Sequence, residues 1–439
     1  MSAVQRYGDL ELSFTSDFSS YWATPSKSLW NYFVGGAYSS GQKVGPKVAW
    51  GKAGILRLKD VSADKSLLRS PVRWERIAEI PGHDLASPVR WAVWRPIPPE
   101  GYVALGDLID VWNGVNEHYA PNFACVKKVH NGRPYVRQGE CGTKIHEAGS
   151  VRLWSVVAPP YPDGDQDERL YLPCGNFTAV TSSGTPAPTA TTWILDLPAV
   201  VEKREGPEIP ELTSHARPPA QTIINDRIVT VPYYMVDDKG RDEGWKVENS
   251  PFYRVQRKRH FDLILYRDNR NGSVPQEESQ AVTTGVTSES SESFSENTGI
   301  TVGTSVGVTA GARPFGMGAE TTVTASISTT VELGYERRTS ISSMREETKV
   351  RGLNIPPRSS ACLWMEHHEL VPIRGNGDTL GNQAALGFAT DYYVTGEYPS
   401  GSGVTYFEEE PSGARATKAP VHLPADLQEA RPEPANVSR

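Results

Sequence analysis

The chain has 439 residues and a net charge of −7, and 38% of its residues are hydrophobic. This length allows about two or three domains with real cores, and the mildly acidic balance gives no electrostatic footprint for nucleic acid. No apolar run reaches the roughly 18 residues of a transmembrane helix, and the first residues lack the apolar segment of a signal peptide. We therefore expect a soluble monomer or low oligomer, released from the producing cell without an evident signal peptide, that binds no nucleic acid.

Residue usage predicts a mostly β protein. The 39 Gly and 34 Pro residues, with abundant Ser and Thr, favour strands and turns over helices. The four cysteines are too few for a disulfide scaffold. Cys125 and Cys141 either form one disulfide or remain buried thiols. No cysteine has the spacing of a metal site and no cofactor fingerprint is present, so we expect neither metal nor cofactor.

Residues 1–200 have the short apolar runs and turn clusters of one all-β domain. The stretch Trp94–Asp107, WRPIPPEGYVALGD, resembles the domain family named after vacuolar protein sorting protein sixty-two, and Asp9–Phe18 matches that family's opening. The resemblance implies a β-prism-like, three-sheet domain for surface recognition, whose receptor is unknown and for which a glycan is one candidate. The family's later motifs fall at Cys125-Val126, Ser150–Trp154 and Cys174–Phe177.

Three stretches around this domain carry no clear chemistry. Residues 25–88 separate the first two family motifs and are interpreted as an insertion. Asp163, Asp165 and Asp167 lack the Gly and Glu that complete a calcium loop, so a solvated loop is predicted. Residues 201–220 are charged and interrupted by proline, which predicts a linker.

Residues 221–400 are expected to form a second β module. Arg257, Lys258 and Arg259 lie between two of its predicted strands, and they either contact anionic lipid headgroups or end a solvated strand. His367-His368 lacks the spacing of a zinc protease and is interpreted as the end of a strand. The predicted strands include residues 227–234, 252–255, 260–266, 353–355 and 361–366.

Residues 299–334 carry the clearest pattern in the chain. Apolar residues occupy even positions from Ile300 to Ala312 and odd positions from Ala319 to Leu333, with mostly Ser, Thr and Gly between them. Period-two alternation indicates strands with one apolar face, and folding the stretch about its centre brings both apolar sets to one face of an antiparallel hairpin. The tip residues are Arg313, Pro314, Phe315 and Met317, and the facing pairs include Ala312 with Ala319, Val308 with Val323 and Ile300 with Val331.

The two faces of this hairpin are typical of a membrane barrel strand, which is apolar towards lipid and polar towards the lumen. Each arm has about 13 residues, more than the ~9–11 that a tilted transmembrane strand needs. A hairpin that covers the core of a soluble sandwich is the alternative. The predicted membrane-facing residues are Ile300, Val302, Val306, Val308, Ala310, Ala312, Val323, Ala325, Ile327, Val331 and Leu333. The predicted pore-lining residues are Thr301, Ser305, Thr309, Glu320, Thr322, Ser326, Thr330 and Glu332.

The segments that flank the hairpin complete a recognisable order of elements. An acidic stretch, 277–298, precedes the hairpin and a basic stretch, 335–351, follows it, which predicts an acidic strand beside a basic one. With the Pro356-Pro357 stop, this order resembles the pore-forming module of the aerolysin family over about residues 225–400. The resemblance implies an elongated antiparallel β module with an amphipathic insertion hairpin.

Residues 401–439 are acidic and then rich in proline, which predicts a disordered tail. The aerolysin resemblance makes this tail a candidate activation peptide, with Arg415, Lys418 and Arg431 as sites for proteolysis. A tail without function is an equally good interpretation.

The resemblance implies a β-pore-forming toxin, insecticidal or cytolytic, that acts at a target-cell membrane. A lone inserted hairpin would leave unpaired backbone groups at both edges, each costing several kcal/mol in lipid, so we expect a homo-oligomeric ring. Gly303–Gly307 fits the nucleophile-elbow pattern, but β alternation continues through it; we expect no catalytic residue and no enzyme. The alternative function is a lectin or carbohydrate-binding two-domain protein that never inserts.

We predict that Val306→Asp abolishes permeabilisation of vesicles and leaves membrane binding intact, because the substitution puts a carboxylate on the lipid face. Dye release and vesicle co-sedimentation measure the two effects. Unchanged leakage would count against the assignment of the lipid-facing side.

Overall fold

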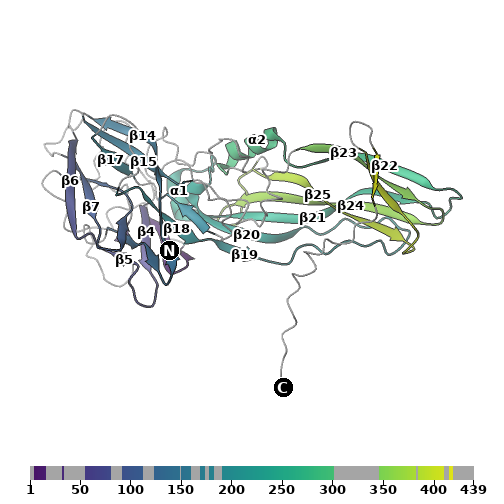
Figure 1. The fold of residues 1–439 in the computed structure, drawn as a ribbon, viewed down its shortest axis with the longest axis horizontal. Coiled ribbons are helices and arrows are strands. Elements are labelled where there is room, and N and C mark those ends of the chain that lie inside the picture. Colours follow the sequence, from purple (N-terminus) through teal and green to yellow (C-terminus); the bar gives the residue numbers. More distant parts are fainter. Residues whose placement is uncertain are drawn as a thin grey trace, which may run out of the picture.

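The computed structural model has a mostly β fold with antiparallel sheets. Two units lie end to end along the long axis, with the N-terminal unit at one end and the predicted module at the other (Figure 1). The structure describes residues 4–15, 32–33, 55–80, 91–111, 123–148, 150–159, 169–173, 177–181, 190–300, 346–381, 384–409 and 415–418.

The N-terminal unit consists of small sheets, three of which contribute to one core. These have the strand orders β1-β2-β4-β3, β5-β10-β8 and β13-β18-β16, and their buried side chains form one cluster. Further sheets are β6-β7-β9, β14-β15-β17 and β11-β12. The strands are β1 Gln5–Tyr7, β2 Leu10–Thr15, β3 Tyr32–Phe33, β4 Ile55–Asp60, β5 Leu68–Arg69, β6 Arg73–Ile80, β7 Trp91–Ile97, β8 Tyr102–Ala104, β9 Leu108–Val111, β10 Cys125–Lys127, β11 Val129–His130, β12 Arg133–Pro134, β13 Val136–Gln138, β14 Glu140–Ala148, β15 Val151–Val157, β16 Arg169–Leu172, β17 Phe177–Val180 and β18 Trp193–Pro198.

For this unit, one expectation is wrong and one open alternative is decided. Residues 25–88 are not a separate insertion, because β4 pairs with β2 over its whole length and packs Leu56 and Leu58 into the core. Cys125 and Cys141 are free thiols, and burial raises the pKa of Cys125 to about 12. The Asp163–Asp167 loop lies outside the described residues.

The C-terminal module contains two sheets. The larger has the order β19-β20-β21-β24-β25 and the smaller has the order β22-β23-β26-β27. Its strands are β19 Val200–Lys203, β20 Ile224–Pro232, β21 Phe252–Asp268, β22 Gln276–Thr284, β23 Glu347–Ile355, β24 Ser360–Ile373, β25 Leu386–Tyr398, β26 Thr405–Glu409 and β27 Arg415–Lys418, and its helices are the 3₁₀ helix η3 Tyr233–Met235, α1 Glu243–Asn249 and α2 Ser288–Thr298. The strands predicted from sequence in this region are therefore confirmed with two changes. The strand predicted at 227–234 ends at Pro232, where η3 begins, and 252–255 and 260–266 are parts of one continuous strand, β21.

The two units share a core where they meet. Phe14 of the N-terminal unit packs edge-on against Tyr233 of the module, with ring centroids 5.2 Å apart, and lies 5.5 Å from Phe252. The Tyr7 hydroxyl donates a hydrogen bond to the Thr230 carbonyl. Aromatic pairs of this kind add stabilisation beyond the area they bury, so the junction is a packed interface.

The range predicted as a linker, 201–220, lies against the module. Its first residues complete β19, which pairs with β20. Further on, Leu212 is buried with Phe261 and Trp364, and a ring nitrogen of His215 lies 2.9 Å from the Ser360 hydroxyl. Residues 201–220 therefore form a strap that lies on the larger sheet. The strap has an irregular backbone, but its contacts with the sheet are specific.

The prediction of a tail from residue 401 is wrong in its first part. β26 pairs with β23, and β27 pairs with β26. Tyr406 and Phe407 are buried, and Glu408, part of the acidic run that suggested disorder, lies 3.7 Å from the Arg351 guanidinium. Arg351, which is distant in sequence, compensates this charge. Arg415 and Lys418, two predicted sites of proteolysis, lie on β27.

We predict that Phe14→Ala lowers the free energy of unfolding by about 3 kcal/mol, the cost of a cavity among packed aromatic rings. Chemical denaturation followed by near-ultraviolet circular dichroism measures the change. Val72→Ala, at a site with 64% exposure, is the matched control and should have little effect. Equal stability of the two variants would show that the shared core does not hold the units together.

Candidate membrane-insertion site

The predicted hairpin is connected to the smaller sheet on both sides. β22 and β23 form an antiparallel ribbon in which Gln276 pairs with Ile355 at one end and Thr284 pairs with Glu347 at the other. The Thr283 and Thr348 hydroxyls lie 2.8 Å apart across this ribbon. The two strands therefore bring the chain ends on either side of residues 285–346 next to each other.

The helix α2 follows β22, where the sequence predicted a strand. Thr287 caps its N-terminus by accepting a hydrogen bond from the Ser290 amide, and Gly299 ends it in the left-handed conformation at φ 69°. Its sequence, SESSESFSENT, is rich in residues with only moderate helix propensity. Its last turn holds Glu296 and no base, so the helix dipole is not compensated there. Local sequence alone therefore gives this helix little stability.

Tertiary packing holds α2 in place. Phe294 and Ile300 are each 1% exposed and belong to the core shared by the two units. The Thr298 carbonyl accepts a hydrogen bond of 2.7 Å from the Asp237 amide, just beyond η3. The first residue of the predicted hairpin is thus anchored at the junction between the units.

Ile300 is the one predicted site residue that the structure describes, and it is buried in protein. This agrees with an apolar hairpin face that is hidden before insertion, but it does not test membrane contact. The other predicted membrane-facing, tip and pore-lining residues lie in 301–345, outside the described residues, and their assignments stay predictions.

The returning strand β23 carries a buried cation. The Arg351 side chain is 2% exposed and lies 3.1 Å from Asp391 of β25 and 3.7 Å from Glu408 of β26. Its guanidinium also lies over the Tyr393 ring at 5.5 Å. The predicted pairing of acidic with basic side chains across β22 and β23 is wrong in detail, because Glu277 lies opposite Asn354 and Glu278 opposite Leu353.

The basic residues of β21 take part in internal ion pairs, so both sequence interpretations of them are wrong. Arg257 pairs with Asp226, and Arg259 pairs with Asp226 and Glu366. Burial would raise the pKa of Glu366, but His368 and Arg259 outweigh it and lower the pKa to about 2. The Glu366 carboxylate thus stays ionised at neutral pH. Lys258 also pairs with Glu369 at 2.9 Å, so this charge ladder joins three strands of the larger sheet, β20, β21 and β24.

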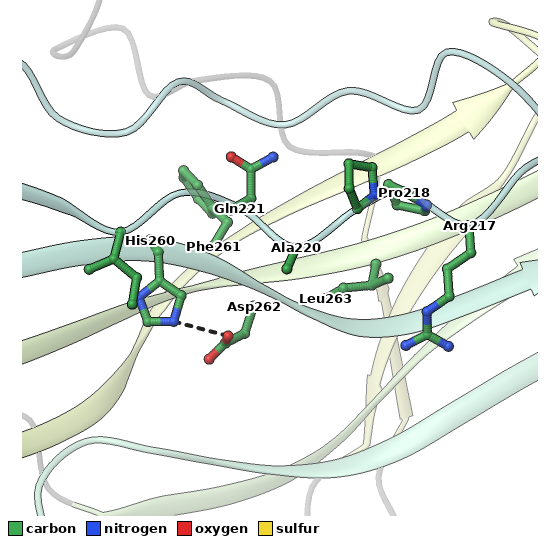
Figure 2. Close-up of a pocket in the computed structure, with 10 residues that line it drawn as sticks. Arg217, Pro218, Ala220, Gln221, His260, Phe261, Asp262 and Leu263 are labelled. Carbon is green, nitrogen blue, oxygen red and sulfur yellow. Dashed lines mark hydrogen bonds and ion pairs between the residues drawn. The ribbon is translucent and has the colours of Figure 1, made fainter.

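The strap and β21 enclose a cavity of about 360 Å³. Figure 2 shows His260 and Asp262 on its β21 side and Pro218, Ala220 and Gln221 on its strap side. The His260 Nε2 lies 3.0 Å from an Asp262 oxygen, and His367 Nδ1 lies 3.6 Å from the other oxygen. His367 and His368 lie within β24, which corrects their assignment to a strand end. Within the described ranges no cluster of side chains is suited to hold a metal ion.

In the described part of the chain, no helix is long and apolar enough to cross a bilayer.

Comparison with protein-family models gives a match within the module. Residues 226–392 match the model of the family described as Insecticidal Crystal Toxin, P42. This region of the chain is therefore similar to insecticidal crystal toxins. The match begins within β20 and ends within β25, and it includes the charge ladder of β21, α2 and the ribbon of β22 and β23.

Two solved structures are similar to the chain. GNIP1Aa from Chromobacterium piscinae has 22% identity and a TM-score of 0.26, and the match covers 44% of this chain and 33% of that one. Cry35Ab1 has 13% identity and a TM-score of 0.31, with 76% and 89% covered. The chain thus spans about a third of the length of GNIP1Aa. No curated protein matches. None of these matches tests the resemblance of residues 7–200 to the vacuolar protein sorting protein sixty-two family, which stays a prediction.

We predict that Phe294→Ala loosens α2 without changing the ribbon of β22 and β23. Removing the only large apolar anchor of a helix with weak local stability should speed amide exchange across Ser288–Thr298 by about tenfold or more. Hydrogen–deuterium exchange with mass spectrometry measures this, and Glu292→Gln, at an exposed position of the same helix, is the control. Equal exchange in the two variants would mean that Phe294 does not anchor the helix.

Proposed function

We propose that the protein is an insecticidal β-pore-forming toxin that binds a target-cell surface, oligomerises and inserts one hairpin per subunit. The match of residues 226–392 to the insecticidal crystal toxin family supports the class of activity. The pore-forming mechanism is supported by the register of the ribbon at the base of the predicted hairpin.

This register is the observation that carries the proposal. Thr284 pairs with Glu347 in the structure. Ile300 lies 16 positions after Thr284, and Val331 lies 16 positions before Glu347. The hairpin register inferred from apolar alternation alone, Ile300 opposite Val331, is therefore the register of β22 and β23 continued without a shift. A one-residue slip in either register would move every side chain to the other face, so the two registers must agree to the residue.

A continued ribbon gives a simple account of insertion. When α2 unwinds, residues 276–312 and 319–355 can pair as one long hairpin with no break in register. Its far part carries the predicted lipid-facing residues on one side and Ser, Thr and two glutamates, Glu320 and Glu332, on the other. Copies must close into a ring, because hairpin edges left open in lipid cost several kcal/mol per unpaired group. The two glutamates then favour cations in the lumen.

The N-terminal unit supplies recognition in this proposal. Its sequence resembles a β-prism-like family, and three of its sheets share one core, as a three-sheet recognition domain would. A glycan is the proposed class of receptor. Activity is by permeabilisation and involves no catalytic residue or cofactor. The alternative, a two-domain lectin that never inserts, is favoured by the same unit but leaves the ribbon register and the hairpin alternation without a role.

We predict that the purified full chain releases dye from vesicles prepared from insect midgut lipids and forms rings visible by electron microscopy. Limited trypsin treatment is included as a second condition, since activation is one predicted role of the C-terminal segment. The double variant E320Q/E332Q should retain dye release and lose the preference for cations in planar bilayers, because it removes the negative charge of the lumen. A protein that binds these vesicles, releases nothing and forms no ring in either condition would favour the lectin.

A further inference from the structure

The two strands that continue into the hairpin differ at their outer edges. No described strand pairs with the outer edge of β22, which is the first strand in the order β22-β23-β26-β27. The outer edge of β23 is covered by β26 over five pairs, from Val350 with Glu409 to Asn354 with Thr405. The ribbon thus has one open edge and one edge that this chain itself covers.

This arrangement conflicts with the geometry of a closed ring of hairpins. Neighbouring strands lie about 4.7–4.9 Å apart, so hairpins in a barrel repeat every two strands, or about 10 Å. If β26 and β27 stayed in the sheet between ribbons, the repeat above the membrane would be four strands, or about 19 Å. The two repeats cannot belong to one continuous wall, so ribbons can adjoin only when β26 leaves β23.

We propose that the outer edge of β23 is the surface on which β22 of a second copy pairs, and that β26 covers this surface in the single chain. The inference rests on the proposed function, since it is the hairpin barrel that requires ribbons to adjoin. Direction supports it: β22 and β26 both run antiparallel to β23. In a ring whose copies share one orientation, β22 of the neighbour arrives in the direction in which β26 now lies.

Charge also fits this partner. Arg351 on β23 is buried, and Glu408 of β26 is one of its two carboxylate neighbours. Taking one partner away from a buried ion pair is strongly destabilising, so an incoming strand is favoured if it brings carboxylates. β22 carries Glu277 and Glu278. The second copy therefore replaces both the backbone hydrogen bonds and the negative charge that β26 supplies.

A disulfide between β23 and β26 tests the proposal. Asn354 and Thr405 are cross-strand partners, and both are exposed, so the double variant N354C/T405C leaves the core intact. Directly opposed positions in antiparallel strands lie about 4.5–5.5 Å apart, within the range of a disulfide. Oxidised, this variant should form at least about tenfold fewer detergent-resistant oligomers on midgut-lipid vesicles, because open edges cannot enter lipid, and reduction should restore them.

The matched control is a disulfide within the ribbon. Thr283 and Thr348 are exposed cross-strand partners whose hydroxyls already lie 2.8 Å apart. Pairing of β22 with β23 persists in the proposed pore, so oxidised T283C/T348C should assemble as the natural chain does. Melting curves of both reduced variants establish that they fold, mass spectrometry establishes that the new cysteines pair, and the oxidised natural chain controls for its own cysteines.

The outcomes separate the two levels of the proposal. If the natural chain assembles and oxidised N354C/T405C assembles equally well, β26 does not cover the interface and this inference is overturned while the proposed function stands. If neither oxidised variant assembles, the pairing of β22 with β23 must itself open during assembly, and this result also overturns the inference. If the natural chain neither assembles nor releases dye, the proposed function fails and the inference fails with it.

Discussion

The hydrogen-bonding capacity of strand edges is the constraint on which this structure depends. A backbone amide or carbonyl at an open edge is satisfied by water, but in lipid it costs several kcal/mol. A protein that inserts a long amphipathic ribbon into a membrane must therefore satisfy the backbone groups at the edges of the ribbon both in water and in lipid. Among the described residues, no strand pairs with the outer edge of β22, and a short strand from the C-terminal part of the chain covers the outer edge of β23. In the proposed pore, copies of the same ribbon satisfy both edges in the membrane.

The cost of open strand edges also explains why the helix α2 follows β22. A strand that continued β22 through Ser288–Thr298 would be longer and more exposed, and long open edges invite aggregation. The helix satisfies its own backbone, and its low propensity means that packing of Phe294 and Ile300 supplies most of its stability. The stored state is thus held by a small number of contacts at one place. In the proposed insertion, this state is released without disturbing the charge ladder that holds β20, β21 and β24 together.

What could be predicted from the sequence follows the range of the interactions involved. Alternation between neighbouring residues is local, and it predicted the strands of the module and a hairpin register that the β22–β23 ribbon matches. The helix α2 was missed because distant packing of Phe294, and not its own propensity, decides its conformation. Arg257, Arg259 and Glu408 were interpreted as solvent-exposed because their neighbours in sequence are polar. Their partners, Asp226, Glu366 and Arg351, lie about 30 to 110 positions away, and only the sheet brings them together.

In the proposed function, the shared core joins recognition by the N-terminal unit to release of the hairpin. Phe14 of the N-terminal unit and Phe294 of α2 belong to one buried cluster, with Tyr233 and Tyr234 between the units. Close-packed interiors transmit displacement, since their side chains have few empty spaces to absorb it. A force that turns the N-terminal unit against the module must therefore disturb the packing that holds the start of the hairpin. In the proposed function, attachment to a surface and release of the ribbon are for this reason linked through the same contacts, and a weaker junction would uncouple them.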